Sequence, residues 1–329
     1  MISSPEASRI MIDLSIVVGA RLPEPLLSQV REAAGPEARV VAETAETALL
    51  PLMPGASVVL AGTFTPAMLA AAPELRWVHS TGAGMERLLF PELIESDVVV
   101  TNARGAHRVA MPEFVLMAML AWTHRLPDLV RAQTRREWIK PVPDEVSGKT
   151  LGLLGYGEIG RAVAARARSL GVRCLALRRH ATRDEGAEQV ERTYRPDQLH
   201  EFLAACDFVV NSLPLTAETR GLLGERELRA MRPEAVLIHL GRGPTVQEGD
   251  LLRALQERWI AGAVLDVFDE EPLPPNSPFW AMENVLVTSH TSGNSVHYLE
   301  RSVAIFCDNL RRFRASEPLR NVVDKRLGY

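Results

Sequence analysis

Short apolar runs alternate along this chain with segments in which apolar residues recur every three or four positions. The clearest case begins at residues 151–154, where three leucines form an apolar run that ends at Gly155. Apolar residues then recur at helical spacing through residues 163–170, and residues 172–177 form the next apolar run. This pattern predicts a strand, a tight turn, a helix and a second strand.

The same alternation continues over most of the chain and predicts an α/β fold with parallel sheets. Strands are expected at 10–18, 39–42, 57–60, 76–80, 98–101, 151–154, 172–177, 208–211, 235–240, 262–267 and 285–288. Further helices are expected at 24–34, 66–72, 112–124, 129–138, 199–204, 225–231, 249–257 and 295–313. The longest apolar stretch, residues 114–122, is too short to cross a bilayer and is interpreted as part of a buried helix.

Length and composition indicate a globular protein with two domains. A chain of 329 residues exceeds the size at which one core usually keeps growing, and a boundary near residue 104 is predicted. With 47% hydrophobic residues, 24% charged residues and a net charge of −4, no basic excess points to nucleic acid. Residues 1–9 lack the pattern of a signal peptide, so we expect a cytoplasmic protein without membrane association.

Three cysteines, Cys174, Cys206 and Cys307, lie far apart, each within an apolar segment. We therefore expect buried reduced thiols. For Trp138 and Trp280 core packing is assumed, with a position in the pocket or at an interface as the alternatives.

The turn after residue 154 carries a glycine pattern with a known physical basis. Gly155, Gly157 and Gly160 fit G-x-G-x-x-G, in which the glycines permit the turn, a close pyrophosphate and close packing of helix on strand. The helix N-terminus would offer its open N–H groups to the phosphates. With a full strand, helix and strand around it, the pattern favours dinucleotide binding over an ordinary turn.

A second loop of small residues, 81–85, follows the strand expected at 76–80. At the carboxyl edge of a parallel sheet such a loop can bind an anion through its backbone N–H groups. A plain turn explains this loop equally well.

Three groups of side chains that could take part in catalysis follow strand ends in the second half of the chain. Arg242 follows one strand, Asp266 and Glu271 another, and His290 a third, and strand ends of one parallel sheet converge on one crevice. The arginine could hold a carboxylate, and the histidine could transfer a proton with an adjacent carboxylate favouring its charged form. Taken singly, an ion pair, a solvated charge or a capping histidine also explains each of them.

These motifs, in this order, resemble the D-isomer-specific 2-hydroxyacid dehydrogenases, most closely the glyoxylate/hydroxypyruvate reductases. The matching segments are 155–160, 207–224, 240–243, 266–272 and 289–290, so the resemblance covers nearly the whole chain. It implies a Rossmann-type dinucleotide-binding domain, 105–292, inserted in a flavodoxin-like substrate domain of residues 1–104 and 293–329. It also implies domain closure around a hinge near Ala103 and Gly293, and a homodimer with helices 112–138 at the interface.

The resemblance implies a role for each matching residue. Arg242 would hold the carboxylate and carbonyl of a small-molecule 2-oxoacid, His290 would be the acid in its reduction, and Glu271 would orient His290. Ala83 and Gly84 would bind the substrate carboxylate. The implied cofactor-binding set, with no metal, is Gly155, Tyr156, Gly157, Glu158, Ile159, Gly160, Arg178, Arg179, Leu213, Pro214, Thr219, Leu240, Gly241, Asp266 and Gly293.

One departure from the family pattern bears on the cofactor. Eighteen residues after Gly160, where the family usually has an acid that binds the adenosine ribose, stand Arg178 and Arg179. Because arginine can pair with a 2′-phosphate, we predict NADP(H), with NAD(H) possible. Solvated arginines at a sheet edge are the alternative. Gly241 and Ser289 also replace the usual alanine and proline.

Two other functions are compatible with these motifs. Some proteins of this fold are dinucleotide-sensing corepressors, and phosphite dehydrogenases share the motifs, whereas Glu271 argues against a formate dehydrogenase. The side chain of the 2-oxoacid is not specified by the sequence.

Overall fold

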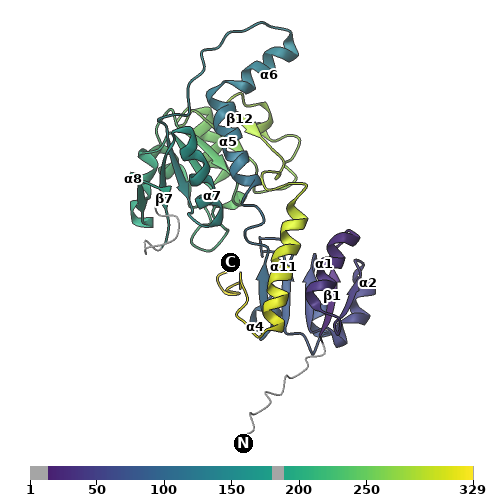
Figure 1. Cartoon of the computed structure of the whole chain (residues 1–329). Coiled ribbons are helices and arrows are strands. Elements are labelled where there is room, and N and C mark those ends of the chain that lie inside the picture. The colour runs from purple at the N-terminus through teal and green to yellow at the C-terminus, as the bar shows by residue number, and fades with distance from the viewer. Residues whose placement is uncertain (1–13, 180–188, 329) are drawn as a thin grey trace, which may run out of the picture. The chain divides into compact units, whose positions relative to one another are not determined.

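The computed structural model describes residues 14–179 and 189–328 (Figure 1). The chain divides into two compact units, Met1–Ala106 with Val296–Tyr329, and His107–Ser295. Each unit contains one parallel sheet with helices, which confirms the predicted α/β class with two domains. The limits of independently folding domains remain a prediction, because compactness alone does not show which segments fold on their own.

The first unit contains a five-stranded sheet in the order β2-β1-β3-β4-β5. All its neighbouring strands pair in parallel, and this order is that of flavodoxin-like folds. Its strands are β1 Ser15–Gly19, β2 Arg39–Ala42, β3 Val58–Ala61, β4 Trp77–Ser80 and β5 Val99–Asn102. Its helices are α1 Glu24–Ala34, α2 Glu46–Leu49, η1 Leu50–Gly55, α3 Pro66–Ala70, α4 Pro91–Glu95 and α11 Tyr298–Arg314.

The last helix of the chain completes this first unit. Helix α11 packs beside α1, and Phe306 of α11 stacks on Trp77 of β4 with ring centroids 5.2 Å apart (Figure 1). Val30 of α1 and Leu310 of α11 are fully buried in the same cluster. Burial of these large side chains stabilises the unit, since each contributes about 1.5–3 kcal/mol relative to exposure. The C-terminal segment therefore belongs to the same core as the N-terminal strands.

The second unit contains a seven-stranded parallel sheet in the order β12-β11-β10-β9-β6-β7-β8. This is the Rossmann order. The chain adds strands on one side of β6 up to β8 and then continues on the other side from β9, so the switch point lies between β6 and β9. Its strands are β6 Thr150–Leu154, β7 Arg173–Leu177, β8 Arg192–Tyr194, β9 Phe208–Asn211, β10 Val236–His239, β11 Gly262–Leu265 and β12 Val285–Val287. Its helices are α5 Ala110–Thr123, α6 Leu126–Arg135, α7 Glu158–Ala167, η2 Arg168–Leu170, η4 Pro196–Gln198, α8 Leu199–Ala204, α9 Glu225–Ala230, η5 Gly243–Thr245, α10 Glu248–Gln256 and η6 Pro278–Ala281.

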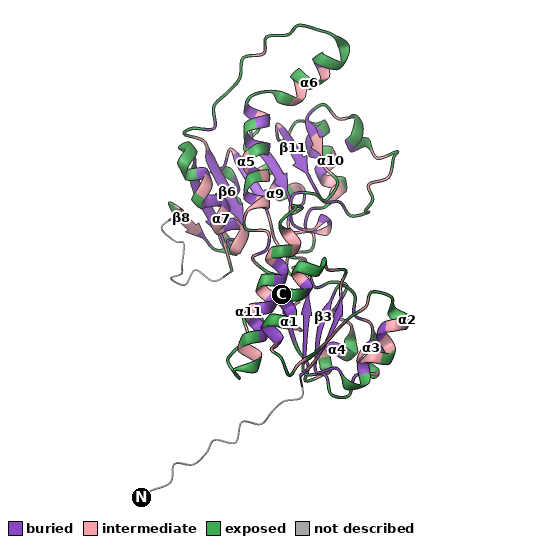
Figure 2. Cartoon of the chain, turned by 45° about the vertical axis from the view of Figure 1, so that its right-hand side comes forward, coloured by how far each residue is buried: buried purple, intermediate pink, exposed green. Residues whose placement is uncertain are grey.

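Both faces of the second sheet are covered by helices, as the buried strands in Figure 2 show. Neighbouring residues of one strand belong to different clusters: Leu237 packs with α8, α9 and α10, whereas Ile238 packs with α5 and α7. Because side chains alternate between the two faces of a strand, a strand buried on both faces is apolar throughout. This burial explains the continuous apolar runs that the sequence shows.

Most predicted segments agree with the structure to within a few residues. The strand predicted at 10–18 is β1, and residues 10–13 of that prediction lie outside the described residues. The short elements α2, α4 and β8 were not predicted. Burial of the three cysteines is confirmed, and this burial raises the pKa of Cys206 to about 12.

The prediction that Trp138 and Trp280 pack in the core is wrong. Trp138 is 89% exposed, because α6 ends at Arg135 and the chain beyond it leaves the helix surface. Trp280 is 52% exposed, and its indole N–H donates to the carbonyl of Pro274 at 3.0 Å.

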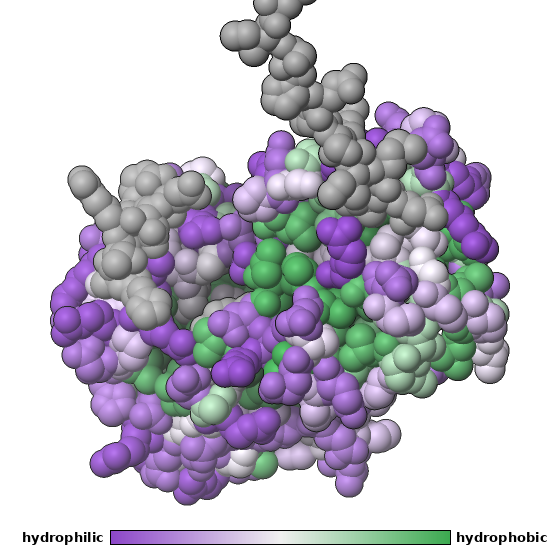
Figure 3. Space-filling view, turned by 90° about the horizontal axis from the view of Figure 1, so that it is seen from below, coloured by the Kyte–Doolittle hydropathy of each residue, from purple (hydrophilic) through white to green (hydrophobic). Residues whose placement is uncertain are grey.

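On the face in Figure 3, hydrophobic side chains gather between predominantly hydrophilic ones.

Within residues 14–179 and 189–328, none of the helices combines the length and the apolar character needed to cross a membrane.

A fully buried histidine lies in the core of the first unit. Nδ1 of His79 is 2.7 Å from Oγ1 of Thr101, and the ring packs near Trp77 and Phe306. Burial lowers the pKa of His79 from 6.5 to about 3. The folded protein therefore keeps this ring neutral at pH values where the unfolded chain protonates it.

We predict that acid destabilises the protein through His79. Below pH 6.5 His79 of the unfolded chain binds a proton, whereas His79 of the folded chain stays neutral down to about pH 3. The free energy of unfolding should fall by up to about 1.4 kcal/mol per pH unit over this range. His79→Gln should reduce this slope in urea unfolding at pH 7, 6 and 5 and leave the part due to His239, whose pKa burial lowers to about 4, while His124→Gln, at an exposed position, should keep the full slope. Equal slopes in His79→Gln and wild type would contradict the prediction.

Candidate active site

The carboxyl ends of six strands in the second unit meet along one edge of the sheet. Backbone N–H groups just after the strands donate to the ends of neighbouring strands: Thr288 to Leu265, Asp266 to His239, Leu240 to Asn211, Ser212 to Leu154, and Gly155 to Leu177. The distances lie between 2.9 and 3.2 Å. Because the strand ends are in register, the segments after β12, β11, β10, β9, β6 and β7 share one edge. Every predicted site residue of this unit lies within eight residues after the end of one of these strands.

The glycine loop after β6 has the geometry that a dinucleotide phosphate needs. Gly155 has φ +97°, which favours glycine, and a Cβ at Gly160 would lie 2.5 Å from the carbonyl oxygen of Gly155. A Cβ at Gly157 would meet no protein atom within 4 Å, so this side of the loop is open. No side chain caps the ten-residue helix α7, which begins at Glu158. The residues present therefore fit a pyrophosphate at the start of α7.

The neighbouring residues of the loop have structural contacts. Tyr156 is buried and Ile159 partly buried against the cluster that contains α5 and α7. The Glu158 carboxylate accepts from Arg161 at 2.5 Å and lies 3.8 Å from Arg108. These two arginines offset an acid that would otherwise repel a phosphate at the helix start.

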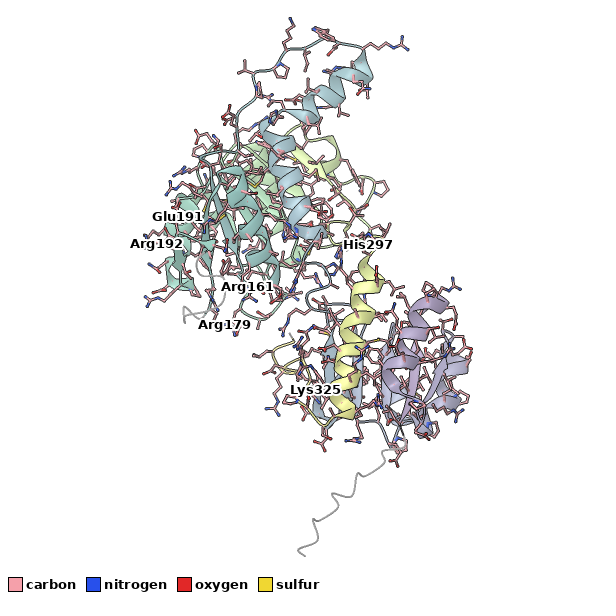
Figure 4. All side chains as sticks on the ribbon, viewed as in Figure 1. Arg161, Arg179, Glu191, Arg192, His297 and Lys325 are labelled. Atoms are coloured by element: carbon pink, nitrogen blue, oxygen red, sulfur yellow. The ribbon has the colours of Figure 1, made fainter. Side chains whose placement is uncertain are left out.

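Two arginines follow the end of β7, beside the glycine loop. The backbone N–H of Arg178 donates to the carbonyl of Tyr194 at 3.1 Å. The Arg179 guanidinium forms an ion pair with Glu218 at 3.2 Å. The hydrogen bond from the Thr216 hydroxyl mainly lowers the pKa of Glu218, and the charge of Arg179 lowers it further. Arg179 and Arg161 are labelled in Figure 4, at the lower end of the second unit in that view.

The remaining predicted cofactor residues surround the ends of β9 and β10. A Cβ at Gly241 would lie 2.6 Å from the carbonyl oxygen of Leu213, so the two segments touch through their backbones. Leu240 is buried, and the Thr219 hydroxyl donates to the carbonyl of Pro214 at 2.6 Å, which closes the loop after β9. Close contact with Leu213 gives a physical reason for glycine at 241.

Asp266, directly after β11, is a fully buried carboxylate that fixes the segment after β12. Its Oδ1 accepts from the Thr288 hydroxyl at 2.5 Å and from the Thr291 N–H at 2.8 Å. Its Oδ2 accepts from the Ser292 N–H at 2.9 Å. A buried carboxylate is stable only with such donors, so the segment 288–292 is tied to Asp266.

His290 lies within this tied segment and pairs with Glu271. Its Nδ1 is 2.7 Å from Oε2 of Glu271, and Oε1 of Glu271 accepts from the Phe268 N–H at 3.0 Å. His290 has φ +53°, a left-handed conformation that costs a residue with a Cβ roughly 1–2 kcal/mol. Its own N–H donates to the carbonyl of Asp266 at 2.8 Å. The structure thus brings the predicted acid and its predicted orienting carboxylate into direct contact.

Arg242 follows β10 at the same edge, and its Nη1 donates to the carbonyl of Gly241 at 2.8 Å. A histidine that was not predicted lies close by. Burial mainly lowers the pKa of His107, and the charges of Arg242 and His290 lower it further. The charges of Arg242 and His290 therefore act on the His107 ring. The sequence signal that could have found His107 is its position three residues after the predicted domain boundary at 104.

The loop predicted to bind an anion belongs to the first unit. Thr81 accepts two hydrogen bonds at its carbonyl oxygen, from the Tyr298 hydroxyl at 2.7 Å and the Ser302 hydroxyl at 2.9 Å. The Ala83 carbonyl accepts from Nδ2 of Asn102 at 2.8 Å, while Gly84 is exposed. Carbonyl groups of this loop are therefore held by side chains, a geometry compatible with both a binding loop and a plain turn.

Among the residues that the structure describes, no three His, Cys, Asp or Glu side chains are grouped to hold a metal ion.

Comparison with known proteins identifies the family. A family model for the NAD binding domain of D-isomer specific 2-hydroxyacid dehydrogenases matches residues 116–292, more than half of the chain. The chain belongs to this dehydrogenase family. The predicted resemblance is thereby confirmed, and the chain is an NAD(P)-dependent oxidoreductase.

Relatives within the family include glyoxylate reductases. The glyoxylate reductase of Thermococcus gammatolerans is 34% identical over 263 residues, which cover 77% of this chain and 78% of that protein. The NADPH-dependent glyoxylate/hydroxypyruvate reductase of Sinorhizobium meliloti, solved with NADP and sulfate, is 28% identical with a TM-score of 0.83. That alignment covers 96% of this chain and 100% of the other.

A second solved relative, a D-isomer specific 2-hydroxyacid dehydrogenase of Xanthobacter autotrophicus, was determined with NADPH and MES. It is 32% identical with a TM-score of 0.84, and the alignment covers 96% of this chain and 100% of that chain. These relatives support a nicotinamide cofactor and the reduction of a 2-oxoacid by this family member.

Proposed function

We propose that this protein reduces a small 2-oxoacid, of the glyoxylate or hydroxypyruvate type, to the D-2-hydroxyacid with NADPH. The observation that carries the proposal is the His290–Glu271 pair, at 2.7 Å, on the sheet edge that also carries Arg242 and the glycine loop. The glyoxylate reductases among the relatives support the substrate class.

The pair assigns the proton-donating atom. A carboxylate only accepts, so Nδ1 of His290 bears hydrogen toward Glu271 and Nε2 is the atom that donates to the substrate carbonyl oxygen. After donation the neutral ring keeps its Nδ1–H on Glu271, so its orientation does not change. The nicotinamide, when bound at the glycine loop, supplies the hydride.

Arg242 is proposed to hold the substrate carboxylate and carbonyl oxygen. A guanidinium has five donors in a fixed plane, so the donation of Nη1 to Gly241 leaves further donors to the same group. In the first unit, the backbone N–H groups of Ala83 and Gly84 are proposed as additional donors to a substrate carboxylate.

Replacement of His290 tests the proposed proton donor. Replacing it with Ala should lower kcat for glyoxylate or hydroxypyruvate reduction by about 10²–10⁴-fold, because a positioned acid contributes that much. Binding of NADPH, measured by fluorescence titration, should be unchanged. A panel of glyoxylate, hydroxypyruvate, pyruvate and bulkier 2-oxoacids with wild type identifies the substrate on which the variant is compared.

Three outcomes would contradict the proposal. Undiminished turnover in His290→Ala would remove His290 from the mechanism. Cofactor binding without reduction of any 2-oxoacid by wild type would favour a dinucleotide-sensing protein, and oxidation of phosphite would favour that enzyme class.

NADP(H) is proposed as the preferred cofactor because of Arg178 and Arg179. Both follow β7 directly, and β7 neighbours the strand that carries the glycine loop. The bond from Gly155 to Leu177, at 3.1 Å, joins these two strand ends. A cationic pair at this place favours the doubly charged 2′-phosphate over a ribose hydroxyl.

Arg178→Ala should lower kcat/KM for NADPH by about 10–100-fold, the worth of a hydrogen bond to a charged group, with little change for NADH. Arg173→Ala is the matched control, because Arg173 begins the same strand and pairs with Glu191 instead. A wild-type preference for NADH, or equal losses with both cofactors, would overturn the proposed preference.

We also propose that the protein is a homodimer, with the segment that contains α6 at the interface. Apolar side chains are exposed there, with Val130 at 49%, Trp138 at 89% and Val142 at 88%, as they are at surfaces that bind a second chain. Light scattering should give twice the mass of the chain, and Val130→Glu should lower it. A monomeric mass for wild type at micromolar concentration would contradict the proposal.

A further inference from the structure

The first residue of the second unit, His107, contacts a residue near its end. Nδ1 of His107 lies 3.0 Å from the carbonyl oxygen of Gly293. Because a carbonyl oxygen only accepts, Nδ1 carries the hydrogen of this bond. The ring also lies against the Gly293 backbone, since a Cβ at this glycine would be 2.6 Å from Nδ1 and 2.8 Å from Cε1.

The surroundings of His107 keep its ring neutral. Burial lowers its pKa, and Arg242 and His290 lower it further, against the opposing effect of the Gly293 carbonyl. His290 in turn faces Glu271 at 2.7 Å, and the Asp266 carboxylate accepts from the N–H groups of Thr291 and Ser292. A neutral ring with its hydrogen on Nδ1 adds a hydrogen-bond donor to this edge without adding a positive charge.

The contact with Gly293 completes the support of a strained segment. His290 has φ +53°, and such conformations persist only when surrounding contacts fix them. Asp266 holds the N–H groups of residues 290, 291 and 292. His107 holds the carbonyl of the next residue, so the backbone is fixed directly after the three residues that Asp266 binds.

We propose that His107 is a positioning residue for His290: its Nδ1–H and its ring hold Gly293, and thereby the backbone that carries the acid. This assignment rests on the proposed function, in which His290 donates the proton. His107 acts through the backbone and transfers no proton itself.

One test reads the tautomer directly and needs no activity. In long-range ¹H–¹⁵N spectra of ¹⁵N-histidine protein at pH 7, the His107 signals, assigned by their loss in His107→Asn, should show a neutral ring protonated at Nδ1. A charged ring or a hydrogen on Nε2 would overturn the proposal.

A second test compares two variants that separate the donor from the bulk of the ring. The asparagine of His107→Asn would place an amide nitrogen near the position of Nδ1, whereas leucine keeps the bulk and lacks the donor. His107→Leu should lower kcat by about 10-fold, the effect of one unsatisfied carbonyl, while His107→Asn retains most of the activity. KM for NADPH and the melting temperature should stay near wild type in both, which a merely structural role would not predict.

A double-mutant cycle with Gly293→Ala tests the contact itself. The added methyl group collides with the His107 ring, so Gly293→Ala should lower kcat strongly in wild type and much less in His107→Ala. Equal losses in the two backgrounds, or full activity of His107→Leu, would overturn the proposal. If wild type reduces no 2-oxoacid, the proposed function fails, and the tautomer measurement still decides the role of His107.

Discussion

The buried carboxylate of Asp266 is the constraint on which the candidate site depends. It lies directly after β11 and binds three donors from the segment after β12, all within 2.9 Å. Burying a charge costs several kcal/mol unless such donors satisfy it, so the carboxylate and the segment order each other. The left-handed conformation of His290 follows from this arrangement, and with it the contact between His290 and Glu271.

The register of the second sheet extends this local constraint to the whole edge. Hydrogen bonds between successive strand ends place Arg178, Gly155, Leu213, Arg242, Asp266 and His290 along one line of loops. The sheet core, apolar on both faces, keeps these ends in place without contributing any chemistry. The edge therefore combines a glycine loop, two arginine groups and a histidine paired with a carboxylate, which fit the proposed nicotinamide-dependent reduction of a 2-oxoacid.

Local signals explain what the sequence predicted well. Helix 24–34 and strand 39–42 were predicted with the same limits that the structure shows, because Gly35 ends the helix and apolar spacing marks both segments. Strand β8 was missed because it has three residues and pairs with a single neighbour, β7. Trp138 and Trp280 were wrongly assigned to the core, since composition alone does not show which large apolar side chains a loop leaves exposed.

The site shows the same division between local and distant information. Arg242, Glu271 and His290 were predicted as candidates because each follows a strand, and strand ends converge by topology. His107 was missed because its partner, Gly293, is 186 residues away and no local pattern links the two. The anchoring contacts of Asp266 with residues 288–292 were likewise not predicted, because a spacing of 22–26 residues gives no indication of direct bonding.

Amide hydrogen exchange in Asp266→Asn tests the central constraint most directly. An asparagine has one accepting oxygen in place of two and presents an amide donor to one of the N–H groups. Protection of the Thr291 and Ser292 amides should fall by about 10–100-fold relative to wild type, as expected for lost hydrogen bonds to a charged group. Amides in β6 and β9 should keep their protection. Unchanged protection at 291 and 292 would contradict the claim that Asp266 holds the segment that carries His290.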